Sequence, residues 1–213
     1  MAEAAVRARL FVIAGVNGAG KSSVLAASTA ISRTPVFNPD VATQQLLAAN
    51  PGLDLDTANS IAWQQGVTML ETAIRDGLVY AFETTLGGTT ITDRLLAAAL
   101  AGAEIRILYV GVDGVDVHAA RVRNRVMAGG HDVPMEAIQR RYVGSRANLI
   151  RLIPHLTDLR LFDNTAEADP RSGLTPKPRL LLHAQRGRVV EMSGLDIVPE
   201  WAKPIVAAAI APP

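Results

Sequence analysis

The chain has 213 residues and a mass of 22.6 kDa, which suits one globular domain with a substantial core. Hydrophobic residues make up 49% and aromatic residues 4%, so we expect a folded protein with a mainly aliphatic core. The 21 Lys and Arg residues and 20 Asp and Glu residues give a formal charge of +1, which argues against a broad nucleic-acid-binding surface. The absence of cysteine excludes disulfides, thiolate metal sites and a cysteine nucleophile.

The apolar segments of the chain are short. The longest runs, Leu95–Ala101 and Ile205–Ala211, are far below the roughly 20 residues that a membrane-spanning helix needs. Near the N-terminus, Phe11–Ala14 is ended by Gly15 and is too short for the core of a signal peptide. The sequence therefore predicts a soluble, cytoplasmic protein with no membrane partner.

Short apolar runs alternate with longer amphipathic segments. The runs predict strands at Leu10–Ala14, Val36–Phe37, Val79–Phe82, Ile105–Val110 and Leu159–Phe162. The amphipathic segments predict helices at Lys21–Ala30, Val41–Ala49, Thr57–Asp76, Thr90–Ala101, Val115–Ala128 and Pro134–His155. This alternation predicts a parallel sheet of about five strands with helices on both faces.

The last part of the chain has a different pattern. It predicts a loop at Asp169–Pro178, a hairpin of Arg179–Ala184 and Val189–Met192 around Arg186–Gly187, and a terminal helix at Pro199–Ala211 interrupted by Pro204. We expect residues 1–213 to form a single domain with a C-terminal appendage at about 170–213, because so short a segment buries little core by itself.

A glycine-rich motif follows the first predicted strand. The segment from Gly15 to Ser22 matches G-x-x-x-x-G-K-[ST] between a strand and a helix, where backbone N–H groups and the helix N-terminus bind phosphate. Lys21 is expected to reach the β and γ phosphates, and the Ser22 hydroxyl to ligate Mg²⁺. The motif therefore predicts an ATP site formed by Gly15, Asn17, Gly18, Ala19, Gly20, Lys21, Ser22 and Ser23.

The next polar motif, Asn38-Pro39-Asp40, has two compatible interpretations. Asn38 is a suitable helix cap, Pro39 a suitable first helical residue, and Asp40 a favourable anion for the first turn. A carboxylate at this strand end is also suited to accept a proton from an acceptor hydroxyl in a phosphotransferase. Asp40 can start a helix and act as this base.

Glu83, Thr84 and Thr85 follow the strand at Val79–Phe82. An acid beside a phosphate loop holds Mg²⁺ through water in related sites, or binds substrate hydroxyls, and it is also common as a solvated strand-end residue. The sequence leaves these alternatives open. Asp113, after the strand at Ile105–Val110, is interpreted as a turn or capping residue.

Six arginines lie between His118 and Arg146, and only two acids accompany them. Arg121 and Arg125 share a helical face, and Gly129-Gly130-His131 separates them from Arg140 and Arg141. Arginine binds phosphate oxygens bidentately with a permanent charge, so residues 118–146 are interpreted as a lid over the nucleotide. A solvated helix face is the alternative for any single arginine.

These motifs, in this order, resemble the zeta-toxin family of P-loop kinases, in particular its short bacterial branch. The resemblance extends over roughly residues 9–165. It rests on GVNGAGKSS (15–23), NPD (38–40), FETTL (82–86), RVRNRVMAGGHDVPMEAIQRRYVGSRANL (121–149) and LFDN (161–164).

The resemblance implies an ATP- and Mg²⁺-dependent kinase of the three-layer α/β/α P-loop NTPase class that acts on a sugar hydroxyl, as on UDP-N-acetylglucosamine. It implies Asp40 as the base, Glu83 with Thr84 and Thr85 at the acceptor, Lys21 with Arg121 or Arg125 at the transferring phosphate, and Asn164 beside the adenine. His131 stands where the toxins carry a phosphate-binding arginine, which shifts that role to Arg140 or Arg141. Some family members have an antitoxin protein as a partner. The residues of this chain do not themselves indicate such a partner.

We therefore expect a kinase that transfers the γ-phosphate of ATP to a hydroxyl of a small molecule, with a nucleotide sugar as the favoured acceptor. The alternatives are another acceptor, such as a free amino sugar, a dinucleotide or a nucleic-acid end, and a regulator that binds ATP without transferring phosphate. The charge of +1 and the absence of a visible aromatic stacking platform argue against a nucleic-acid partner. A regulator would have no use for Asp40.

Overall fold

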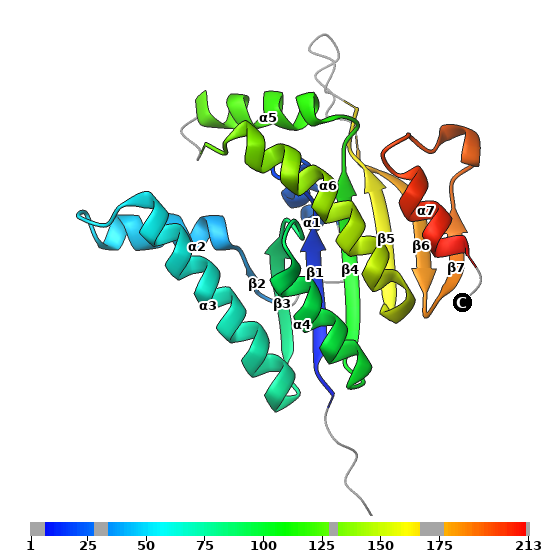
Figure 1. The fold of residues 1–213 in the computed structure, drawn as a ribbon, viewed down its shortest axis with the longest axis horizontal. Helices are drawn as coiled ribbons and strands as arrows, with labels where there is room; N and C mark the ends of the chain where they lie inside the picture. The colour runs from blue at the N-terminus through cyan, green and yellow to red at the C-terminus, as the bar shows by residue number, and fades with distance from the viewer. Residues whose placement is uncertain (1–6, 28–33, 128–131, 167–176, 212–213) are drawn as a thin grey trace, which may run out of the picture.

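The computed structural model describes residues 7–27, 34–127, 132–166 and 177–211. In these ranges one seven-stranded sheet has the order β2-β3-β1-β4-β5-β6-β7 (Figure 1). Its strands are β1 (Arg9–Ala14), β2 (Val36–Phe37), β3 (Val79–Thr84), β4 (Glu104–Gly111), β5 (Asp158–Asp163), β6 (Arg179–Gln185) and β7 (Arg188–Met192). The first five strands in this order are parallel, as the sequence predicts.

Helices connect the parallel strands. They are α1 (Lys21–Ala27), α2 (Pro39–Ala49), α3 (Leu55–Asp76), α4 (Thr89–Leu100), α5 (Val115–Met127), α6 (Met135–Leu152) and α7 (Lys203–Ile210), with short 3₁₀ turns at Ile153–His155 and Leu195–Ile197. The predicted helix over Pro134–His155 therefore ends in a different geometry. Pro154 lies in its final 3₁₀ turn, where its missing N–H costs no α-helical hydrogen bond.

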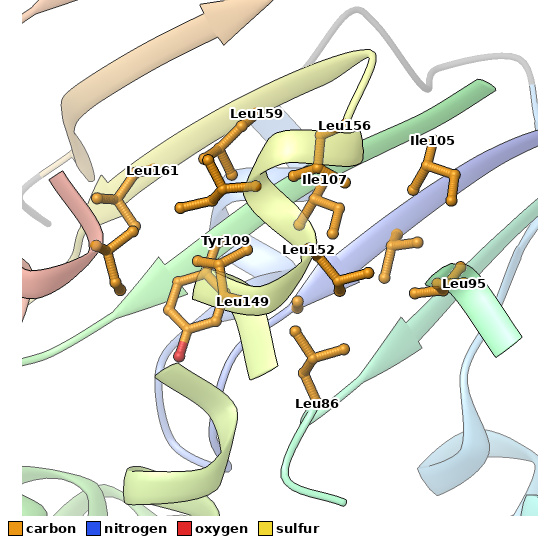
Figure 2. Close-up of a cluster of buried hydrophobic side chains, with 14 of the residues drawn as sticks. Leu86, Leu95, Ile105, Ile107, Tyr109, Leu149, Leu152, Leu156, Leu159 and Leu161 are labelled. Carbon is orange, nitrogen blue, oxygen red and sulfur yellow. The ribbon is translucent and has the colours of Figure 1, made fainter. Parts of the chain in front are cut away.

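The main core lies on the face of the sheet covered by α4, α6 and α7 (Figure 1). Leu149 and Leu152 of α6 lie between the sheet residues Ile107 and Tyr109 and the α4 residue Leu95 (Figure 2). Successive side chains of β1 alternate between faces, so Val12 packs in this core and Ile13 packs in a smaller cluster on the opposite face, where α1 lies. The three-layer α/β/α fold class is thereby confirmed.

The C-terminal segment differs from its prediction in two ways. β6 pairs antiparallel with β5, so the hairpin extends the sheet to seven strands and contributes to the main core. Its turn matches the predicted hairpin, with φ of 48° at Arg186 and 73° at Gly187, as a two-residue hairpin turn requires. Pro204 does not interrupt the last helix but begins it, because a proline in the first turn loses no intrahelical hydrogen bond.

Within the described ranges, no helix is both long enough and apolar enough to cross a membrane.

Candidate active site

The phosphate loop and the acidic strand ends lie together because β1 is at the centre of the parallel sheet. Ala14 is paired with Thr84 of β3, and the Gly15 N–H donates to the Thr84 carbonyl at 3.2 Å. The next strand, β2, lies on the other side of β3 and leads into Asn38 and Asp40. The carboxyl ends of three parallel strands therefore meet at one place, which is where such sheets bind ligands.

A pocket of about 510 Å³ opens at this place, within the usual range for a small-molecule site. Its polar lining includes residues that the sequence selects, namely Asn17, Asp40, Glu83, Thr84, Thr85 and Arg141. These residues come from four separated parts of the chain.

The phosphate loop has the backbone that its glycines permit. φ is 144°, 81° and 85° at Gly15, Gly18 and Gly20, a region that favours glycine. Space is also limiting, since a Cβ on Gly20 would lie 2.2 Å from the Asn164 amide nitrogen and one on Gly18 would lie 2.8 Å from the His118 carbonyl oxygen.

Side chains from three elements bind this loop. Asn164, which follows β5, donates from Nδ2 to the Ala19 carbonyl at 2.8 Å. His118 of α5 donates from Nδ1 to the Asn17 carbonyl at 2.8 Å, and Arg141 of α6 donates to the Asn17 side-chain oxygen at 2.8 Å. The loop is therefore held in place by the protein itself.

His118 is buried and neutral in this arrangement. Burial lowers its pKa from 6.5 to about 4, and the positive charge of Arg121 acts in the same direction, while the bond to the Asn17 carbonyl opposes the shift. Sequence reasoning missed His118, because an isolated histidine on a helix is usually a core residue. The only signal was its place at the start of the arginine segment.

Lys21 begins α1 and donates from Nζ to the Gly15 carbonyl at 3.0 Å, so its charge remains beside the loop. Burial lowers the pKa of Lys21 from 10.5, and the negative charges of Glu83 and Asp40 oppose this effect. Ser22 and Ser23 are exposed at the start of the same helix, so both hydroxyls are accessible to a ligand.

Asn38 and Asp40 divide the two predicted roles between them. The Asn38 side chain accepts from the backbone N–H groups of Asp40 at 2.9 Å and Val41 at 3.4 Å, and Pro39 is in the first turn, so the capping prediction is confirmed. Asp40 makes no cap. Its carboxylate is exposed in the pocket and lies 3.6 Å from the guanidinium of Arg125.

Glu83 is a partly buried acid of the pocket with a raised pKa. Burial raises the pKa of its carboxyl above 4.5, the charge of Asp40 raises it further, and Lys21 lowers it. Two carboxyl groups and one ammonium group therefore share this site. Perturbed acids in a cleft mark functional sites more often than structural ones.

The two arginines of the predicted lid helix have separate surroundings. Arg125 lies beside Asp40, and Arg121 donates to the carbonyls of Thr165 at 3.3 Å and Ala166 at 3.5 Å, in the segment after β5. The hinge at Gly129–Gly130 and His131 lie outside the described residues. Arg140 is exposed on α6, whereas the neighbouring Arg141 faces the pocket.

Helix α6 also holds the loop that follows Glu83. Asn148 is buried and donates from Nδ2 to the carbonyls of Leu86 at 2.9 Å and Gly88 at 3.0 Å. A Cβ on Gly144 would lie 2.6 Å from the Gly87 carbonyl oxygen, so the helix and the loop are in close contact. The motif R-R-Y-x-x-S-x-x-N-L thus includes residues that fix the pocket.

Thr84 and Thr85 lie in the same loop. Their hydroxyl oxygens accept from the N–H groups of Leu86 at 3.0 Å and Gly87 at 3.4 Å, which leaves both hydroxyl hydrogens for other acceptors. Leu86 has a φ of 53°, uncommon for a residue with a side chain, and it is buried in the core (Figure 2). The loop is therefore held in a demanding conformation at the edge of the pocket.

The pocket also has an apolar lining that was not predicted. Trp63 of α3 and Phe37 of β2 line it, with Val67 and Ile91 nearby. The sequence could not predict that these two aromatic residues line one pocket, because Phe37 and Trp63 lie far apart in the chain and only the fold brings both to it.

In the described residues, no group of three or more His, Cys, Asp and Glu side chains forms a metal cluster. Mg²⁺ in phosphotransferases is held by one or two protein groups together with substrate phosphates, so it does not need such a cluster. The exposed Ser22 hydroxyl and the Glu83 carboxyl provide groups of the required kind.

Comparison with known proteins agrees with this fold. No protein-family model matches the chain. An uncharacterized protein of Haemophilus influenzae is 29% identical over 129 residues, which are 60% of this chain and 88% of that protein.

Among solved structures, the AvrRxo1-ORF1:-ORF2 complex with ATP matches with a TM-score of 0.64 and 17% identity, over 95% of this chain. The PezAT toxin–antitoxin system of Streptococcus pneumoniae matches with a TM-score of 0.52 and 12% identity, over 82% of this chain and 76% of that chain. The chain spans 64% of the length of the AvrRxo1 chain.

The phosphate loop between β1 and α1 and the parallel strand order define a P-loop fold of the α/β/α class, and the AvrRxo1 and PezAT structures share this fold.

Proposed function

We propose that this protein is an ATP-dependent kinase that phosphorylates a hydroxyl group of a small molecule. The observation that carries the proposal is the pocket in which Asp40 and Glu83 lie beside the phosphate loop and its Lys21. A protein that only binds ATP needs the loop but not an acidic pocket next to it.

The loop residues Gly15 to Ser23 fit a nucleoside triphosphate, since their backbone is fixed in a phosphate-binding conformation by His118 and Asn164. Mg-ATP supplies the transferable phosphoryl group when bound. Ser22 would hold Mg²⁺, and Glu83 would act as a second ligand through water or as a ligand of the acceptor. Lys21 offsets the charge of the β and γ phosphates.

We propose Asp40 as the general base, because its carboxylate is exposed in the pocket. The acceptor oxygen forms a bond to the γ-phosphorus, the bond to the bridging oxygen of ADP breaks, and the hydroxyl proton passes to the Asp40 carboxylate. Thr84, Thr85 and Arg141 line the same pocket and bind the acceptor. We propose Arg125, which lies beside Asp40, as the arginine that stabilises the transferring phosphate.

Arg121 is proposed for the nucleotide instead. Its guanidinium contacts the backbone of Thr165 and Ala166, directly after Asn164. These contacts support a role at the nucleotide, because Asn164 is the residue proposed to lie beside the adenine.

A nucleotide sugar such as UDP-N-acetylglucosamine is the proposed acceptor, with another hydroxyl-bearing metabolite as the alternative. The test is incubation of the purified chain with γ-labelled ATP and a metabolite extract, followed by mass spectrometry of labelled products. An Asp40→Asn chain is the control. A labelled small molecule formed only by the wild-type chain supports the kinase. If no molecule in the extract becomes labelled although the chain binds ATP, the result supports a regulator.

A protein partner is also proposed, because the AvrRxo1-ORF1:-ORF2 structure is a two-component complex and PezAT is a toxin–antitoxin system. If this chain is a toxic kinase, its induced expression in bacteria arrests growth and the Asp40→Asn chain does not. Equal growth of the two strains contradicts the toxic role and leaves the kinase proposal standing.

A further inference from the structure

The last residue of β5 is a buried acid that the proposed reaction does not use. Asp163 is 8% exposed, and it directly precedes Asn164, which binds the phosphate loop at the Ala19 carbonyl. Burial of a carboxylate is costly unless hydrogen-bond donors surround it. The donors around Asp163 come from the residues just after β5 and from residues 179–210, which we call the C-terminal segment.

On one side, Asp163 fixes the residues that follow it. Its Oδ1 accepts from the backbone N–H of Thr165 at 3.2 Å and from the Thr165 hydroxyl. The oxygen of that hydroxyl accepts from the Asp113 N–H at 2.9 Å, and the Thr165 carbonyl accepts from Arg121 of α5 at 3.3 Å. Asp163 therefore holds a short segment that binds the phosphate loop through Asn164 and the helix α5 through Thr165.

On the other side, the C-terminal segment supplies two donors to the same carboxylate. Trp201 donates its indole N–H to Oδ1 of Asp163 at 3.3 Å, and Arg179 of β6 donates to Oδ2 at 3.1 Å. Trp201 is 2% exposed, whereas the Arg179 side chain is 47% exposed and reaches the carboxylate from the surface. Both oxygens of the carboxylate are therefore bound by the C-terminal segment.

The ring of Trp201 also packs against the end of β4. A Cβ on Gly111, the last residue of this strand, would lie 2.4 Å from the ring, so only glycine fits here without a shift. The Gly111 carbonyl in turn accepts from the Asn164 N–H at 2.9 Å. Trp201 therefore contacts two neighbours of Asn164: Asp163 precedes it in the chain, and Gly111 binds its backbone.

We propose that Trp201 and Arg179 are positioning residues for the nucleotide, and that they act through Asp163 on Asn164 and Thr165. Without its two donors the buried carboxylate has to turn toward other partners, and the backbone that follows it shifts with it. The C-terminal segment is then part of the ATP site, although none of residues 179–210 lines the pocket beside the phosphate loop. This inference rests on the proposed use of ATP.

The first test measures the dissociation constant of a non-hydrolysable ATP analogue with Mg²⁺ by calorimetry. Trp201→Phe keeps an aromatic ring against Gly111 but removes the N–H donor, and Arg179→Ala removes the second donor at an exposed position. Each variant should bind the analogue about fivefold or more weakly, the lower end of the usual range for coupling between two sites. Arg179→Lys keeps a charged donor and should recover part of the affinity.

The stoichiometry of the same titration separates positioning from stability. It reports the fraction of folded chain, so a variant that is only less stable lowers the stoichiometry and leaves the dissociation constant unchanged. Arg188→Ala is the control, because Arg188 is exposed on the neighbouring strand β7. Unchanged dissociation constants for both Trp201→Phe and Arg179→Ala, or an equal change for Arg188→Ala, overturn the inference.

A double-mutant cycle tests the path through Asp163. Asp163→Asn should itself weaken analogue binding, and Arg179→Ala should add nothing further in that background, because both changes break the same contact. Additive effects contradict the path.

Hydrogen exchange of the wild-type chain tests the same coupling without the Asp163 variant. Coupling is reciprocal, so a saturating analogue should slow exchange in β6 and α7, and less so in Arg179→Ala. Exchange in these elements that does not respond to the analogue contradicts the inference.

Failure of the kinase proposal gives a different result. A chain that binds ATP but labels no acceptor is not a kinase, yet the loss of affinity in Trp201→Phe and Arg179→Ala still supports the positioning role. Analogue binding that Lys21→Ala weakens and these two variants leave unchanged contradicts the positioning role alone. A wild-type chain that does not bind the analogue contradicts both.

Discussion

The two sides of the pocket are built in different ways. On the phosphate side, His118, Arg141 and Asn164 hold the loop by hydrogen bonds of 2.8 Å, and Asn148 fixes the loop after Glu83. On the α2–α3 side, the wall includes the exposed Trp63 and the half-buried Phe37, whose ring packs on Gly66, with one hydrogen bond between Thr43 and Asn59.

In the proposed kinase, this difference gives the two sides of the pocket separate roles: the phosphate side carries out phosphoryl transfer, and the α2–α3 side selects the acceptor. Phosphoryl transfer depends on positioning and charge, so its groups need a rigid frame. Recognition of an acceptor depends on the shape of the wall, which can change residue by residue without disturbing that frame. We therefore expect substitutions on the phosphate side to affect the rate and the stability, and those on the α3 side to affect the choice of acceptor.

The largest effect is expected from Lys21→Ala. The variant removes the compact charge beside the β and γ phosphates, and we expect phosphotransfer to fall by about 10²–10³-fold or more, with weaker ATP binding. Calorimetry with Mg-ATP and a phosphotransfer assay measure both. Unchanged affinity and turnover would show that the phosphate side is not the nucleotide site.

Asp40→Asn tests whether Asp40 acts as the general base. The Asn38 side chain caps α2, so the variant should fold with little loss of stability and bind Mg-ATP nearly normally. Its rate of acceptor phosphorylation should fall at least about 100-fold, as removal of a general base typically does. Asp56→Asn is the control, because Asp56 is an exposed acid in the first turn of α3. A wild-type rate for Asp40→Asn would leave Asp40 without a catalytic role.

His118, on the phosphate side, makes the free energy of unfolding depend on pH. Its folded pKa of about 4 lies below the unfolded value of 6.5, so the unfolded chain binds the proton more tightly. The stabilisation is present above about pH 6.5 and is lost as the pH falls toward about 4. Between about pH 7 and pH 5 this single group should lower the free energy of unfolding by about 2 kcal/mol.

Chemical denaturation at several pH values, comparing wild type with His118→Asn, measures this contribution. The amide of the variant keeps an N–H donor for the Asn17 carbonyl but does not titrate. The two chains should therefore differ in the slope of stability against pH, and parallel curves would contradict a neutral buried His118.

Asn148→Ala should have the smallest effect on this side. The variant removes the side-chain donor of the Leu86 carbonyl and one of the donors of the Gly88 carbonyl, and we expect about 1–2 kcal/mol lower free energy of unfolding. Asn124→Ala, at an exposed position of α5, is the matched control. If the acceptor loop depends on α6, Asn148→Ala also raises KM for the acceptor more than it raises KM for ATP, and equal changes in both would argue against that dependence.

The order of strands and helices was predictable from the sequence because each element has its own hydrophobic periodicity and each loop has its own turn-forming residues. The conformation of the phosphate loop, from Gly15 to Ser22, was also predictable from adjacent residues, since the motif itself dictates the turn. The cap at Asn38 is a further local feature. The ends of the helices were less predictable. At Pro154 and Pro204, for example, a proline is compatible with more than one helical geometry.

The tertiary structure decided which of these residues meet. The sequence alone determined a P-loop fold with Lys21 at its phosphate loop and acids after the next two strands, because those features depend on neighbours in the chain. Only the fold brought Trp63 and Phe37 to the pocket, turned Arg121 toward the segment after β5, and made the hairpin part of the sheet. These results depend on contacts between residues far apart in sequence, whose burial and direction no local pattern specifies.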